Sequence, residues 1–293
     1  MFDFLLTSAF LKRLFLDQVH IRRSKWNSLI KKTQLDPAIP LFRDRERELV
    51  EFFELSRRQL RSLYIRKGFP NTQRFKFYLD NFFRDQVHPG VLKIAYEKAA
   101  FFYCLRLMLA FERYSMISNY LDILFAQGGN GKQRLESWKI FDYGCGVSDI
   151  GILLASLGAQ VTICDLADQK LSFAEWRYHK RQLEVEVIAI NNPEEAPPLK
   201  KGNYDLIIAT EVLEHVPNPL QCLTAVTGAI RSGGFLFNSM GNGFNRDIGG
   251  DHLETAMIIG NSEAYRTFCQ ANYVPLVQSE NMNYLFRKVD ARP

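Results

Sequence analysis

The sequence predicts an α/β protein in which an all-helical N-terminal part precedes a parallel sheet covered by helices on both faces. Three observations support this fold class. After about residue 131, short buried-strand patterns alternate with helix patterns. Before that point, apolar residues recur at helical spacing and strand signals are absent. A turn with two glycines follows the first strand pattern, and ligands of parallel sheets bind at this end of the strands.

Composition limits the class of protein. The chain has 293 residues, 47% hydrophobic and 24% charged, enough for a large core and an accessory domain. No run of about 18 apolar residues occurs, so no transmembrane helix is expected. Five cysteines without a CxxC pair suggest neither a disulfide framework nor a zinc site, and they favour a cytoplasmic location. These cysteines are Cys104, Cys145, Cys164, Cys222 and Cys269.

Charge divides the chain into two predicted domains. Residues 1–130 carry 22 Lys and Arg against 13 Asp and Glu, a balance of +9, whereas residues 131–293 carry 15 against 19, a balance of −4. The glycine-rich "AQGGNGKQR" marks the border. The basic clusters "RRSKW" and "IKK" are suited to contact with RNA or a peripheral membrane surface. Alternating charges in "RDRERE" instead favour a solvated helix face.

The N-terminal domain is expected to be helical. Apolar residues three and four apart occur in "RDRERELVEFFELSRRQLRSLYIRK", and a long apolar helix is predicted over residues 96–125. We expect this domain to cover the acceptor pocket and to set specificity for an apolar or aromatic acceptor. The residues that support this expectation are Leu49, Phe52, Phe53, Leu60, Leu63, Phe101, Phe102, Tyr103 and Phe111.

The C-terminal domain alternates strands and helices in chain order. "KIFDYG" predicts a strand, "DIGILLASLG" a helix ended by Gly158, "AQVTICD" a second strand and "DQKLSFAEWRYHKRQ" a second helix. Strands at "EVEVIAI" and "YDLIIAT", a helix around "LQCLTAVTGAI" and a strand at "GGFLFNSM" follow. The tail "YVPLVQSENMNYLFRK" predicts two strands that form an antiparallel edge.

The turn after the first strand is built for close approach of a ligand. Gly144 and Gly146 let the backbone pass near it, and the following helix points its N-terminus at the same place. Asp149 stands where the dinucleotide fingerprint GxGxxG requires its last glycine, so a dinucleotide is disfavoured. Asp165, 19 residues after Gly146 at the end of the second strand, is placed to accept hydrogen bonds from a ribose.

Over residues 135–290 the chain resembles the class I S-adenosylmethionine-dependent methyltransferases. The resemblance rests on "FDYGCGVS", "ICDLA", "YDLIIATEVLEHV" and "IRSGGFLF". It implies a Rossmann-like seven-stranded methyltransferase sheet and S-adenosyl-L-methionine as cofactor. Ser148 departs from it, because a third glycine is frequent there, and an asparagine replaces a frequent aspartate near the adenine. The residues that the resemblance assigns to cofactor binding are Asp142, Gly144, Gly146, Asp165, Leu166, Asn191, Asn192 and Thr210.

The segment "EVLEH" carries the candidate chemistry of the reaction. Glu214 and His215 lie three and four residues after Glu211, on one face if this turn is helical, and His252 follows the fifth strand. This set resembles ubiquinone-pathway O-methyltransferases and, more distantly, the enzymes that methylate the 2′-hydroxyl at small-RNA 3′ ends. It suggests a Mg²⁺ or Mn²⁺ site. Without metal, His215 or His252 would act as a local base, and His215 and Glu211 are the candidate catalytic residues. In a purely structural alternative, the histidine packs and the glutamate caps a helix.

The sequence therefore predicts a methyltransferase that acts on a hydroxyl, or less favourably a nitrogen or carbon, of a small aromatic or lipid-like acceptor. Two alternatives remain. The basic N-terminal domain and the two glutamates and two histidines suit an RNA 2′-O-methyltransferase. A non-catalytic adaptor that keeps the fold would show an eroded cofactor motif, and Asp142 and Asp165 speak against that.

Overall fold

The computed structural model describes residues 45–60, 135–194, 196–238, 252–278 and 284–289, together with six residues between 100 and 108. The strands are β1 (Lys139–Tyr143), β2 (Gln160–Leu166), β3 (Glu186–Ile190), β4 (Tyr204–Ala209), β5 (Ile230–Asn238), β6 (Tyr273–Gln278) and β7 (Tyr284–Lys288). The helices are α2 (Arg45–Phe52), α7 (Asp149–Ser156), α8 (Gln169–Lys180), the 3₁₀ helix η1 (Leu213–His215), α9 (Pro219–Ala229), α10 (Glu254–Gly260) and α11 (Glu263–Asn272).

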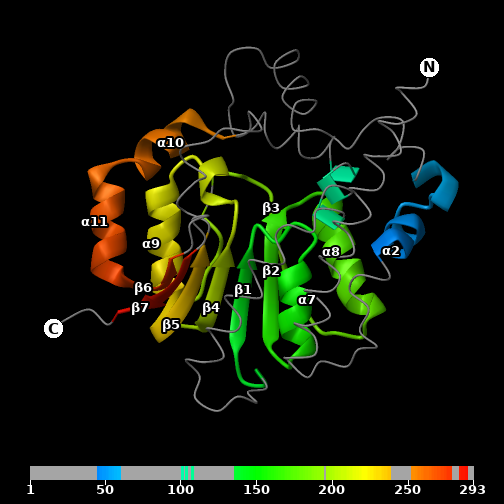
Figure 1. Cartoon of the computed structure of the whole chain (residues 1–293), viewed down its shortest axis with the longest axis horizontal. Coiled ribbons are helices and arrows are strands. Elements are labelled where there is room, and N and C mark those ends of the chain that lie inside the picture. The colour runs from blue at the N-terminus through cyan, green and yellow to red at the C-terminus, as the bar shows by residue number, and fades with distance from the viewer. Residues whose placement is uncertain are drawn as a thin grey trace, which may run out of the picture.

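The seven strands form one sheet with the order β3-β2-β1-β4-β5-β7-β6 (Figure 1). Neighbouring strands from β1 to β5 are parallel, and β1 pairs with both β2 and β4. The strand order therefore reverses at β1, and the ends of β1 and β4 flank the point where open α/β sheets bind ligands. This confirms the predicted Rossmann-like seven-stranded sheet.

The two C-terminal strands form an antiparallel edge of the sheet, which confirms the prediction for this segment. β7 pairs antiparallel with β5 on one side and with β6 on the other. The last strand is therefore inserted inside the sheet, while β6 forms the edge and runs in the same direction as β1 to β5. Two antiparallel strands could have joined β5 through either β6 or β7, and the structure uses β7. The sequence pattern contained no information that distinguishes these two orders.

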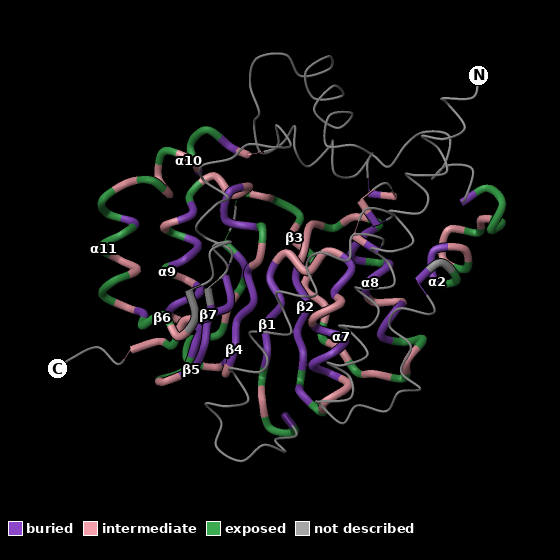
Figure 2. Tube along the Cα trace, viewed as in Figure 1, coloured by how far each residue is buried: buried purple, intermediate pink, exposed green. Residues whose placement is uncertain are grey.

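Two hydrophobic cores cover the two faces of the sheet. Successive residues of a strand point to opposite faces, and Ile140 belongs to one core while Phe141 belongs to the other. The first core packs α7 and α8 against the sheet, and the second packs α9 and α11 against it. Figure 2 shows the central strands as continuous buried segments between these helices. Strands buried on both faces have near-continuous apolar sequences. This is why the alternation of strands and helices along the chain could be predicted.

The described N-terminal residues pack at the end of the sheet that carries α8. A third cluster of buried residues joins α2 and the helical residues near 100–108 to Val147 and Phe173. Phe52, the last residue of α2, and Phe53, which follows it, lie 4.9 Å and 5.5 Å from Phe173, measured between ring centroids. The helical expectation holds for these short segments. The rest of residues 1–130, including Leu63, Phe102 and Phe111, and the domain border lie outside the described residues.

One expectation for this region is wrong. The alternating charges of "RDRERE" predicted a solvated helix face, yet Arg45 and Glu48 are buried and only Arg47 of the three is exposed. The two buried charges contact charged groups of α7 and α8, which lie far away in the sequence.

Within the ranges that the structure describes, none of the helices has the length and apolar character needed to cross a membrane.

We expect Leu236→Ala to lower the free energy of unfolding by about 2–5 kcal/mol, because the side chain of Leu236, a residue of β5, is fully buried in the second core. Ile258→Ala is the control, since Ile258 is 65% exposed, and its effect should stay within about 0.5 kcal/mol. Urea denaturation followed by circular dichroism measures both. Equal losses in the two variants would contradict the placement of β5 in the sheet centre.

Candidate functional site

The turn between β1 and α7 requires its two glycines. Gly144 and Gly146 have φ angles of 64° and 57°, which side-chain-bearing residues rarely adopt. A Cβ atom on Gly144 would lie 2.2 Å from Cγ2 of Val212, and one on Gly146 would lie 2.9 Å from Cδ1 of Leu107. The backbone of the turn is therefore enclosed by a residue that follows β4 and by a residue of the N-terminal segment.

Ser148 occupies the position where the resembling family often has a third glycine, and its geometry explains how a serine is accepted. Its φ is 50°, a left-handed conformation, and it precedes the first residue of α7. Its hydroxyl donates a hydrogen bond to Asp142 Oδ2 at 2.9 Å and lies 3.1 Å from the Tyr178 hydroxyl. The serine side chain thus points into the protein and away from the space above the turn.

Asp142 is a buried carboxyl group at the end of β1. Burial raises its pKa to about 7, an effect strengthened by the nearby Asp165 and Asp149 and opposed by hydrogen bonds from Ser148 and the Gly151 backbone. Near neutral pH the Asp142 carboxyl group is therefore partly protonated, whereas an ordinary aspartate would be fully ionised.

Asp165 ties the end of β2 to the glycine turn. Its Oδ2 accepts a hydrogen bond from the Gly146 backbone N–H at 2.8 Å, and its Oδ1 accepts one from the Leu166 N–H at 2.7 Å. Lys170 Nζ lies 3.7 Å from Oδ1 and also pairs with Asp168. Each carboxylate oxygen accepts two hydrogen bonds, so Asp165 retains capacity for a ribose hydroxyl.

The other predicted cofactor residues also follow the carboxyl ends of strands. Leu166 is half-buried at the end of β2, Asn191 and Asn192 are exposed after β3, and Thr210 is half-buried after β4. The carboxyl ends of β1 to β4 meet at one edge because these strands are parallel. The sequence-based set is therefore gathered along a single edge of the sheet.

A second group of polar side chains lies at the same edge, after β4. Glu214, His215 and His252 each offer one potential ligand atom, and these atoms all lie within 4.8 Å of one another. The rings of His215 and His252 are 5.1 Å apart and nearly perpendicular. The Leu253 N–H donates to the Glu214 carbonyl at 3.0 Å, which brings the segment before α10 to η1.

Two atoms of this group are buried without a hydrogen-bond partner among the residues that the structure describes. They are Glu214 Oε1 and His252 Nδ1. Burial raises the pKa of the Glu214 carboxyl, with Glu211 acting in the same direction and His215 and His252 opposing it. Polar groups left unpaired in this way are unfavourable, so the site is suited to an added ligand such as a cation or an acceptor hydroxyl.

Glu211 does not join this group, contrary to the prediction. The expectation assumed a helical turn, in which residues three and four apart share a face. The chain instead forms a three-residue 3₁₀ helix that begins at Leu213, and Glu211 lies before it with a φ of 55° and an exposed side chain. The described ligand set therefore consists of one carboxylate and two imidazoles rather than two of each.

Two residues of the site were not singled out from the sequence. Lys170 is buried at the start of α8 beside Asp165 and Asp168, and Val212 contacts Gly144. A lysine in a first helical turn gives no sequence signal of burial, because lysine is ordinarily solvated. Val212 was visible only as part of the strand-four motif, and its contact depends on the spatial order of β1 and β4.

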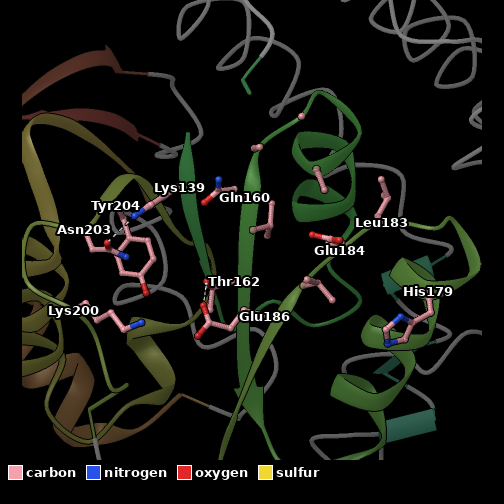
Figure 3. Close-up of a pocket in the computed structure, with 15 residues that line it drawn as sticks. Lys139, Gln160, Thr162, His179, Leu183, Glu184, Glu186, Lys200, Asn203 and Tyr204 are labelled. Carbon is pink, nitrogen blue, oxygen red and sulfur yellow. Dashed lines mark hydrogen bonds between the residues drawn. The ribbon is translucent and has the colours of Figure 1, made fainter. Parts of the chain in front are cut away.

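A pocket of about 850 Å³ lies at the amino ends of β1 to β4, opposite the ends that carry the glycine turn (Figure 3). Its lining includes Lys139, Gln160, Glu186 and Tyr204, which are the first residues of β1 to β4. His179 of α8 also borders it and is exposed. This pocket is therefore separated from the glycine turn by the length of the strands, and none of the candidate cofactor residues lines it.

Comparisons with known proteins agree with this geometry. Residues 141–238 match a family described as "Methyltransferase domain". The ubiquinone biosynthesis O-methyltransferase of Shewanella halifaxensis is 37% identical over 131 residues, which cover 44% of this chain and 50% of that protein. The enzyme of the same name from Idiomarina loihiensis is 34% identical over 140 residues, 46% of this chain and 50% of that protein. The chain thus spans about half the length of these curated relatives.

Among solved structures, a crystal structure of a SAM-dependent methyltransferase from Aquifex aeolicus is similar over 53% of this chain and 82% of that chain. Its sequence identity is 18% and the TM-score is 0.39.

We expect the stability of the protein to depend on pH through Asp142. The folded protein raises the pKa of this group, so the folded state binds its proton more tightly than the unfolded state. That stabilisation is complete below the unfolded pKa of about 4 and is lost as pH rises through about 7. Relative to Asp142→Asn, the wild-type free energy of unfolding should therefore fall between pH 5 and pH 8 by on the order of a few kcal/mol. Urea denaturation at both pH values measures the difference, and a constant difference would contradict the assignment.

Proposed function

Since residues 141–238 form a class I, S-adenosylmethionine-dependent methyltransferase domain, we propose that the protein methylates a hydroxyl group of a small aromatic or lipid-like acceptor. The observation that carries the proposal is the contact of Asp165 with Gly146 at the point where the strand order reverses. The relatives from Shewanella halifaxensis and Idiomarina loihiensis are named as O-methyltransferases of ubiquinone biosynthesis, which supports a hydroxyl as the methylated group.

In this proposal the turn between β1 and α7 binds the methionine part of the cofactor. Gly144 and Gly146 contribute no side chains of their own there, and Asp142 supplies a buried carboxyl group beneath the turn. Asp165 would accept hydrogen bonds from the ribose hydroxyls, Leu166 would flank the adenine, and Asn191 or Asn192 would bind its amine. Thr210 would line the far side after β4.

Methyl transfer from a sulfonium is an in-line displacement. The acceptor oxygen forms a bond to the methyl carbon while the carbon–sulfur bond breaks, and the hydroxyl proton leaves to a base or is lost beforehand. The protein must therefore align the acceptor and favour loss of that proton, with no covalent nucleophile of its own. Cys145 is not needed as one, and burial raises the pKa of its thiol well above the ordinary value.

In this proposal the group of Glu214, His215 and His252 acts on the acceptor. The two unpartnered buried atoms, Glu214 Oε1 and His252 Nδ1, fit the requirement for oxygen and nitrogen ligands of a divalent cation. A bound Mg²⁺ or Mn²⁺ would lower the pKa of an acceptor hydroxyl. Without a cation, the His215 imidazole would accept the proton directly. Both routes place the acceptor after β4, next to the turn that holds the cofactor.

An RNA 2′-O-methyltransferase remains the second candidate, because the ligand group suits any pair of vicinal hydroxyls and residues 1–130 carry a balance of +9. Binding of a labelled oligonucleotide that weakens steeply with salt would favour RNA. Methylation of a catechol without such binding would favour the small acceptor. The adaptor alternative requires that S-adenosylhomocysteine does not bind.

We expect S-adenosylhomocysteine to bind the wild-type protein and to bind Asp165→Ala more weakly. The variant loses the carboxylate that holds Gly146 and would accept hydrogen bonds from the ribose, so the loss should be about 1.5–3 kcal/mol, or roughly 10- to 150-fold in Kd. Asp205→Ala is the matched control, because Asp205 lies at the amino end of β4 and bonds to the start of β1. Isothermal titration calorimetry measures all three. Wild-type affinity in Asp165→Ala would contradict the cofactor assignment.

We expect Mn²⁺ to bind in the presence of S-adenosylhomocysteine and to bind at least about tenfold more weakly in Glu214→Gln and His252→Ala. Electron paramagnetic resonance of free Mn²⁺ measures this without any turnover. His179→Ala is the control, since His179 is an exposed histidine on α8. Methylation of a catechol should fall on addition of chelator in the wild type. Equal Mn²⁺ binding in all three variants, or turnover unaffected by chelator, would argue for the route without metal.

A further inference from the structure

A cluster of buried charged side chains joins α2 to the residues that follow the glycine turn. Arg45 and Glu48 come from α2, Arg177 from α8, and Asp149 is the first residue of α7. Arg45, Glu48 and Arg177 are between 0% and 2% exposed. Buried charges are tolerated when they are paired and hydrogen-bonded, so the cluster fixes the relative positions of these three helices.

Arg177 orients three groups at once. Its Nε donates to Glu48 Oε2 at 2.9 Å, its Nη2 donates to Asp149 Oδ1 at 2.8 Å, and its Nη1 donates to the Val147 carbonyl. A guanidinium holds its donors in one rigid plane, so the positions of these acceptors depend on one another. Val147 directly follows Gly146, and the Glu48 contact is therefore transmitted to the backbone of the cofactor turn.

Arg45 adds a second connection between α2 and the turn. Its Nη2 lies 2.7 Å from Asp149 Oδ1, and its Nη1 donates to the carbonyls of Met108 at 2.5 Å and Leu107 at 3.3 Å. The Leu107 side chain in turn contacts the Gly146 position, where it would lie 2.9 Å from an added Cβ. The charges of α2 thus also place the N-terminal residue that lies against the turn.

Glu48 balances the charges of this cluster. It pairs with Arg177 and with Arg181, so that three guanidinium groups, including Arg45, share two carboxylates. Replacing Glu48 by a neutral residue leaves the same three guanidinium groups with Asp149 alone among the carboxylates of the cluster. Unbalanced buried charge is strongly unfavourable, so Arg177 would shift toward water or toward Asp149. Either movement alters its contact with Val147.

We propose that Glu48 is a positioning residue for the cofactor, which acts through Arg177 to hold the turn from Gly144 to Ser148 in its binding conformation. The inference rests on the proposed function, because it assumes that S-adenosylmethionine binds at this turn. It makes α2, which precedes the methyltransferase domain in the sequence, part of the cofactor-binding unit. Because coupling between two sites is reciprocal, cofactor binding must also stabilise the docking of α2.

The wild-type protein provides the first test. Hydrogen–deuterium exchange of α2 (Arg45–Phe52) is measured with and without saturating S-adenosylhomocysteine, with α11 (Glu263–Asn272) as reference because it lies at the other end of the sheet (Figure 1). We expect exchange in α2 to slow several-fold while exchange in α11 changes little. Equal changes in the two helices would overturn the proposal. This measurement needs no variant and so does not depend on whether a variant folds.

The second test compares two substitutions in the same helix. Glu48→Gln should raise the Kd for S-adenosylhomocysteine about tenfold or more and should abolish the added protection of α2. Glu51→Gln is the matched control, because Glu51 pairs with Arg47 and Lys180 at the surface, and it should bind within about twofold of the wild type and keep the protection. A Glu48→Gln variant that binds as tightly as Glu51→Gln would overturn the inference alone. Absence of binding by the wild type would overturn the proposed function as well.

Discussion

The hydrogen bond from the Gly146 N–H to the Asp165 carboxylate is the interaction on which the site depends. It joins the turn that leaves β1 to the end of β2, and it can form because these strands are parallel neighbours in register. On the other side, β4 also pairs with β1 and places Val212 against Gly144. The turn is therefore held by both neighbouring strands. The positive φ angles of its glycines are the conformational requirement of that enclosure.

The sheet and most of its helices could be predicted because their signals are local. Buried strands between amphipathic helices have a recognisable period, and Gly158 with a φ of 95° ends α7 as expected. The same local signals place the candidate cofactor residues near the carboxyl ends of β1 to β4, since each of them lies at or just after the end of a strand. The insertion of β7 between β5 and β6 could not, because strand order is decided by packing between distant segments. The predicted position of Glu211 was wrong for a related reason. The prediction assumed an α-helical turn, whereas the chain forms the 3₁₀ helix η1 there.

Buried charges are the second class of feature that local patterns cannot reveal. A periodicity argument treats arginine and glutamate as solvent-facing, and for Arg47 this is correct. Arg45 and Glu48 are buried on the same helix because Asp149 and Arg177, far along the chain, provide partners of opposite charge. The desolvation of each group is offset only when all of them are assembled. Such a cluster stabilises one arrangement of α2, α7 and α8, and its members are recognisable only in three dimensions.

The two halves of the site differ in how their polar groups are satisfied. Around the turn, the Ser148 hydroxyl donates a hydrogen bond to Asp142, and the Gly146 N–H donates one to Asp165. This half is therefore formed before any ligand arrives. Beyond β4, Glu214 and His252 each keep a buried atom without a partner among the described residues. A preformed half would lower the entropic cost of cofactor binding, whereas the incomplete half would gain its missing hydrogen bonds or metal bonds when a cation or an acceptor binds. On the proposed function, the cofactor half of the site therefore needs less rearrangement on binding than the acceptor half.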